Sequence, residues 1–146
     1  MSLTSLQHYR AQVEDQLKME LAQIAQALVQ AEQSCERLAQ EQGVQEERYR
    51  QEMRDGVRIE QLLQWQSHFE AHAAATEQAR RTVAHWRQEW EQAQLRLVAA
   101  RQDRQTLERL AERYQETAQA GERRREQLAT DDAAHYRGSP KGDPLP

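Results

Sequence analysis

One short segment, Arg54-Asp55-Gly56-Val57-Arg58, holds the only strong helix-breaking pair in the interior of this chain. Glycine readily adopts the left-handed conformation that ends a helix, and an Asp side chain accepts hydrogen bonds from amides that a helix end leaves free. The segment therefore predicts a turn over residues 54–58. On both sides of it, the hydrophobic pattern is that of a long helix.

Upstream of the turn, a heptad pattern predicts a first helix from about residue 3 to residue 53. The residues of its apolar seam follow one another in alternating steps of three and four: Leu21, Ile24, Leu28, Ala31, Cys35, Leu38, Gln42, Gln45 and Tyr49. Nearer the N-terminus, Val13, Leu17 and Leu21 are separated by two steps of four. Such spacing predicts a local relaxation of the supercoil within a continuous helix.

Downstream of the turn, the same alternation predicts a second helix over about residues 58–136. Its seam is Leu62, Trp65, Phe69, His72, Thr76, Ala79, Val83, Trp86, Trp90, Ala93, Leu97, Ala100, Arg104, Leu107, Ala111, Tyr114, Ala118, Gly121, Arg125 and Leu128. Two such seams joined by a short turn predict an all-α fold, a two-helix antiparallel coiled-coil hairpin with a longer C-terminal helix. With the turn centred near Gly56, Tyr49 is expected to face Leu62, and pairing is expected to end near Leu107.

The predicted organisation is one coiled-coil hairpin over residues 1–137, followed by a flexible tail over residues 138–146. Composition supports the hairpin, because Ala, Glu, Lys, Leu and Arg make up 73 of the 146 residues. That share is typical of coiled coils. The net charge of −4 is too small to favour disorder.

The low content of turn-forming residues argues against an enzyme. The five Gly and three Pro, most of them in the last nine residues, cannot supply a phosphate-binding loop or the turns of a sheet. A hairpin has no concave pocket in which a catalytic group would work. We therefore expect a non-enzymatic protein with no catalytic residue, no metal and no cofactor.

Two histidines and one cysteine are candidates for a metal-binding or reactive site. His68 and His72 lie four residues apart and could share a helix face, but no third metal ligand is evident, and ordinary surface or seam histidines are the favoured interpretation. Cys35 lies at a seam position, where it is expected to act as a small apolar residue.

The charge pattern and the chain's N-terminus bear on partners and location. The densest basic cluster, Arg123-Arg124-Arg125, is flanked by Glu122 and Glu126, so we expect no nucleic-acid binding. No apolar run is long enough to span a bilayer, and the first residues lack the order of a signal peptide. We expect a cytoplasmic protein that does not itself insert into the membrane.

Three aromatic residues lie near the turn on both sides of it: Tyr49, Trp65 and Phe69. Packing within the seam is one interpretation of this group. The other is a docking surface, because large aromatic side chains contribute most to protein interfaces.

Several segments, in order, resemble the FliJ family, the small component of the flagellar type III export apparatus, and more distantly the YscO stalks of injectisomes. The resemblance covers about residues 17–136. The matching segments are Glu47-Arg48-Tyr49-Arg50, the Gly56 turn followed by Trp65-Gln66-Ser67-His68-Phe69, Leu107-Glu108-Arg109-Leu110-Ala111-Glu112-Arg113, and Asp131-Asp132-Ala133-Ala134.

This resemblance implies a stalk that inserts into the export ATPase hexamer, promotes its assembly and links it to the export gate membrane protein and to export chaperones. It implies a location at the periphery of the inner membrane. The family's ATPase contacts lie toward the chain ends, which implies ATPase binding by Arg113, Arg124, Asp131 and Asp132.

Gate contacts of the family lie nearer the turn, which implies export-gate binding by Tyr49, Trp65 and Phe69. This chain departs from the family pattern at Gln45, Ala73 and Thr76. Gate binding is therefore the less secure half of the implied function. A generic coiled-coil scaffold, an export chaperone, a homodimeric tether and an injectisome stalk remain the alternatives.

Overall fold

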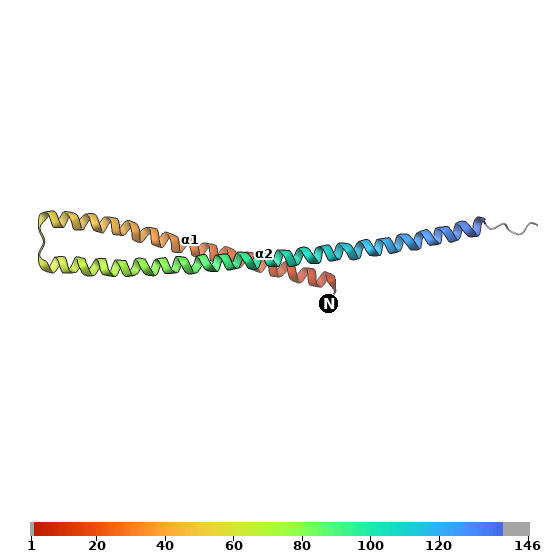
Figure 1. Cartoon of the computed structure of the whole chain (residues 1–146), viewed down its shortest axis with the longest axis horizontal. Helices are drawn as coiled ribbons and strands as arrows, with labels where there is room; N and C mark the ends of the chain where they lie inside the picture. The colour runs from red at the N-terminus through yellow and green to blue at the C-terminus, as the bar shows by residue number, and fades with distance from the viewer. Residues whose placement is uncertain (1, 139–146) are drawn as a thin grey trace, which may run out of the picture. The chain divides into compact units, whose positions relative to one another are not determined.

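The computed structural model describes residues 2–138, which form two α-helices and no strand (Figure 1). Helix α1 spans Leu3–Asp55 and helix α2 spans Ile59–Gly138. The predicted all-α hairpin is confirmed. Gly138 ends α2, and the rest of the predicted tail lies outside the described residues.

The start of α1 is capped by a serine side chain. The backbone N–H of Ser5 donates a hydrogen bond to Ser2 Oγ at 3.1 Å, which satisfies one of the amides that have no partner within the helix. The Ser2 carbonyl accepts the first helical bond, from the N–H of Leu6. Helix α1 thus begins at Leu3, as the sequence pattern predicted.

The turn between the helices is shorter than expected and depends on one glycine. Gly56 directly follows α1 and has a φ of 87°, in the left-handed region where side chains with a Cβ are strained. At the start of α2, the N–H of Leu62 donates to the carbonyl of Arg58, and the Arg58 N–H donates to Gln61 Oε1 at 3.3 Å. Between the end of α1 and the start of α2, only residues 56–58 are non-helical.

Contacts divide the chain into two compact units, which are described separately. The hairpin unit comprises residues 12–101, where α1 and α2 run side by side in opposite directions (Figure 1). Of the described residues, the terminal unit comprises 2–11 together with 102–138. The prediction of a single domain over residues 1–137 stays a prediction.

The α2 seam of the hairpin unit is the predicted one. Every predicted seam residue from Trp65 to Ala100 is buried or half-buried. The most buried apolar side chains of the described residues are Ala93, Leu97 and Ala100 on α2 and, elsewhere along the seam, Ala31 on α1; these four are 2–8% exposed. Small residues let the two helix backbones approach closely, as expected of a narrow seam.

Near its N-terminus the α1 seam includes a residue that the pattern did not predict, Glu14 beside Val13. Glu14 is only 4% exposed, whereas Val13 is half-buried. With Glu14 in the seam, the steps from Arg10 through Leu17 to Leu21 are four, three and four, so the heptad is not interrupted. The pattern of apolar residues does not predict a seam position at Glu14, because this residue is charged.

The predicted pairing register is also displaced. Tyr49 packs against the rings of Trp65 and Phe69, one to two helical turns beyond Leu62. Because α1 continues through Asp55 and α2 begins only at Ile59, the midpoint of the turn moves toward Val57. Partners on α2 therefore lie roughly one helical turn further from the turn than predicted.

In the terminal unit, the first residues of α1 pack beside the part of α2 that follows residue 101. Arg10 Nη1 lies 3.3 Å from Asp103 Oδ2. Half-buried side chains continue along α2 to Ala111, so the predicted end of pairing at Leu107 is one turn too early, as the register displacement requires. From residue 112 to residue 137, Gly121 alone is not exposed.

Candidate functional site

An aromatic cluster of Tyr49, Trp65, His68 and Phe69 lies near the turn. Tyr49 of α1 meets both large rings of α2 edge-on, at centroid distances of 5.8 Å to Trp65 and 5.3 Å to Phe69. Trp65 and Phe69 are themselves stacked, with centroids 5.5 Å apart. The structure thus brings together the three residues for which the resemblance implied gate binding.

A hydrogen bond fixes the orientation of the Trp65 ring. Its Nε1–H donates to Glu52 Oε2 at 2.5 Å. Glu52 follows Tyr49 by three residues and continues the α1 seam, so one helix supplies both the ring and the acceptor that hold Trp65. Glu52 was not among the predicted site residues, although its heptad position, three residues after Tyr49, indicates that it faces α2.

Tyr49 and Phe69 of the cluster line a shallow groove of about 500 Å³. Tyr49, Leu62, Phe69 and Ala73 line it with apolar surface, and Gln66 and Glu70 stand beside them. Next to the groove, the start of α2 exposes a further apolar surface: Ile59 is 70% exposed and Leu63 is 56% exposed. Tyr49, Trp65 and Phe69 are half-buried, so they pack in the seam and still present surface to a partner.

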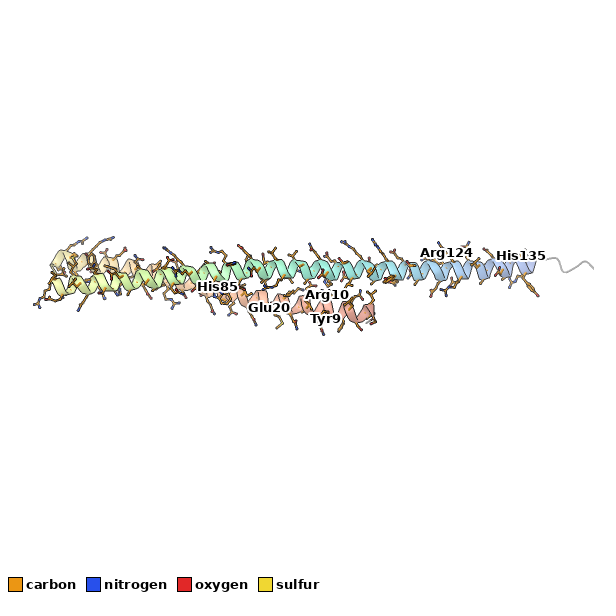
Figure 2. The ribbon with its side chains drawn as sticks, turned by 60° about the horizontal axis from the view of Figure 1, so that its bottom comes forward. Tyr9, Arg10, Glu20, His85, Arg124 and His135 are labelled. Atoms are coloured by element: carbon orange, nitrogen blue, oxygen red, sulfur yellow. The ribbon has the colours of Figure 1, made fainter. Side chains whose placement is uncertain are left out.

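The exposed stretch, defined as residues 112–137 of α2, carries the four residues for which ATPase binding was implied. All four, Arg113, Arg124, Asp131 and Asp132, are exposed. Spacings of 11 and 7 residues place Arg113, Arg124 and Asp131 on one side of the helix, with Asp132 about 100° away. In Figure 2, Arg124 lies in this stretch, where α2 has no helix beside it.

Arg113, Arg124 and Asp131 form a line along the helix rather than a compact site. Arg113 and Asp131 are separated by roughly 27 Å along the helix axis, at 1.5 Å per residue. Such an arrangement suits a long contact with a surrounding surface and cannot enclose a small ligand.

The contacts of His68, His72 and Cys35 are those of ordinary seam or surface residues. The His68 and His72 rings have centroids 6.4 Å apart, and His72 Nδ1 lies 3.5 Å from Thr76 Oγ1, within the seam. Cys35 is a half-buried free thiol. Residues 2–138 contain no group of three His, Cys, Asp or Glu side chains arranged to hold a metal ion.

Comparison with protein families identifies the chain. The sequence model described as Flagellar FliJ protein matches residues 1–142, nearly the whole sequence. The chain belongs to the FliJ family. No curated protein and no solved structure matches it.

Membership of the FliJ family makes the chain a component of flagellar export and favours the flagellar system over the injectisome alternative. The helical coiled-coil hairpin agrees with that family. Within the described residues, neither helix has a stretch apolar and long enough for a membrane span.

Proposed function

We propose that this FliJ-family chain is a non-enzymatic stalk that inserts into the export ATPase hexamer and promotes its assembly. The observation that carries the proposal is the exposed stretch of α2, which continues as a helix after its pairing with α1 has ended. An unpaired helix of this length is marginally stable in water. A ring of subunits around it would supply the missing contacts.

The side chains of the exposed stretch suit such a surrounding partner. The continued seam positions are small or polar, notably Ala118, Gly121 and Arg125, and offer little apolar area to a single partner helix. Small side chains fit a narrow channel. Arginine and carboxylate groups form contacts with a ring that can break and re-form as its subunits change conformation, because exposed ion pairs are weak.

The same proposal gives the aromatic cluster a second partner. Tyr49, Trp65 and Phe69, with the groove that Leu62 shares, form the apolar surface expected to bind the export gate membrane protein. Binding there would hold the chain at the inner membrane without inserting it. Export chaperones are the third class of partner that family membership suggests.

Adding the purified chain to the flagellar export ATPase is expected to raise both the hexameric fraction and the rate of ATP hydrolysis. The physical reason is that one helix in contact with several subunits stabilises only their assembled form. Light scattering and a phosphate-release assay measure the two effects. Hydrolysis by the chain alone, or an unchanged hexamer fraction, would refute the stalk.

Replacing Phe69 with alanine is expected to weaken gate binding by about tenfold or more, since buried aromatic anchors dominate interfaces. Titration of the gate protein's cytoplasmic domain by calorimetry measures the effect. Alanine at Val98, which is 48% exposed and far from the aromatic cluster in sequence, is the control. Equal affinities for the two variants would argue against the aromatic cluster as the gate site.

A further inference from the structure

Glu14 is the one buried charged side chain among residues 2–138. It is 4% exposed, and it occupies a seam position of α1. Its Oε1 lies 3.5 Å from Arg101 Nε on α2 and 3.5 Å from Lys18 Nζ, one turn further along α1. A carboxylate thus takes a place that an apolar residue holds at most other positions of this seam.

Stability does not explain a carboxylate at this position. Removing a charged group from water is costly, and an apolar residue of similar size commonly stabilises a buried site at least as well as an ion pair. Charged or polar residues within coiled-coil seams are best known for selecting which helices pair. The position of Glu14 therefore raises the question of which pairing it disfavours.

The α1 seam is rich in leucine, which also packs well against a second copy of the same helix, so its apolar residues alone do not exclude an α1–α1 pair. These residues are Leu17, Leu21, Leu28 and Leu38. A parallel, in-register dimer of two copies would place each seam residue opposite itself. Glu14 would then face Glu14 in a buried position, where like charges repel strongly. On α2, the half-buried Arg104 at a seam position would likewise face itself.

Pairing of α1 with α2 provides Glu14 with Arg101, whereas a parallel α1–α1 pair does not. Lys18 is on the same helix as Glu14 and accompanies it in either arrangement, so Lys18 cannot distinguish the two. The Arg10–Asp103 pair of the terminal unit, at 3.3 Å, follows the same complementary rule between α1 and α2. Arg101 is therefore a group of α2 that favours the α1–α2 arrangement.

We propose that Glu14, through Arg101, selects α2 over α1 of a second copy as the partner of α1 and so disfavours a parallel dimer. The carboxylate acts as a specificity-determining residue against self-association. This inference does not depend on the ATPase or gate contacts, because it concerns the free chain.

The test compares the full chain with its Glu14→Leu variant by analytical ultracentrifugation and thermal melting. The wild-type chain is expected to be monomeric. Glu14→Leu is expected to self-associate at least about tenfold more tightly, while melting at the same or a higher temperature. Glu14→Gln keeps the size of the side chain but not its charge, and is expected to self-associate to an intermediate degree.

Glu20→Leu is the matched control, because Glu20 is an exposed acid on the same helix (Figure 2). It makes the same change of charge and apolarity outside the seam and is expected to remain monomeric. A monomeric Glu14→Leu variant, equal association of the Glu14→Leu and Glu20→Leu variants, or a wild-type chain that is already dimeric would overturn the proposal.

Discussion

Replacing Leu97 with alanine is expected to destabilise the hairpin by about 3 kcal/mol and to lower its melting temperature by about 10 °C. Leu97 is 5% exposed and lies between Ala93 and Ala100 in the most buried part of the α2 seam. Truncation leaves a cavity there that two helices joined at one turn can close only by shifting together. Thermal unfolding followed by circular dichroism measures the change.

Leu95→Ala provides a control two residues away on the same helix. Leu95 is 70% exposed, and alanine is an equally good helix former, so its melting temperature is expected to stay within about 2 °C of the wild type. Equal losses for the two variants would show that α2 is stabilised by helix propensity rather than by the seam.

Reversing charges on the exposed stretch is expected to weaken ATPase binding by about tenfold per residue, which corresponds to about 1.4 kcal/mol each. The variants are Arg113→Glu, Arg124→Glu and Asp131→Arg. Since all three side chains are exposed, the reversals are expected to leave the melting temperature nearly unchanged. Binding is measured by biolayer interferometry on the assembled ATPase, at two salt concentrations, because ionic contacts weaken with salt.

Arg96→Glu is the matched charge control for the Arg113→Glu and Arg124→Glu variants. Arg96 is exposed on α2 within the hairpin unit, so its reversal changes the net charge equally without touching the exposed stretch. If Arg96→Glu and Arg113→Glu bind the ATPase equally well, the effect is one of net charge, and the proposed location of the contact is wrong.

Heptad arithmetic predicted the α2 seam from Trp65 to Ala100 because most of its positions carry an apolar side chain. The same arithmetic failed at Glu14, where a charged residue holds the seam position and the apolar search moved to Val13. Continuing the heptad register from Leu21 and Leu17 toward the N-terminus, whatever the residue type, places Glu14 in the seam. The displaced pairing has another cause, since the length of a turn depends on the backbone angles of a few residues such as Gly56, which a repeat pattern does not contain.

The candidate site was predictable to a similar extent. Tyr49, Trp65 and Phe69 flank the turn at seam positions, so any hairpin with this break brings them together. The hydrogen bond from Trp65 to Glu52 depends on side-chain rotamers, and sequence spacing alone does not specify it. The exposure of residues 112–137 followed from the unequal lengths of the two helices, whereas the partners assigned to it came from the family resemblance.

The Gly56 turn also has a consequence for synthesis of the chain on the ribosome. Trp65 and Glu52 are 13 residues apart, whereas Arg10 and Asp103 are 93 apart. Loop closure therefore costs about 2 kcal/mol more for the second pair, so the contacts near Gly56 are expected to form first. Translation of 93 residues takes roughly 5–20 s, during which the start of α1 has emerged and its partner has not. Through this interval on a crowded polysome, where several nascent copies of α1 lie close together, the buried charge of Glu14 would discourage them from pairing with one another.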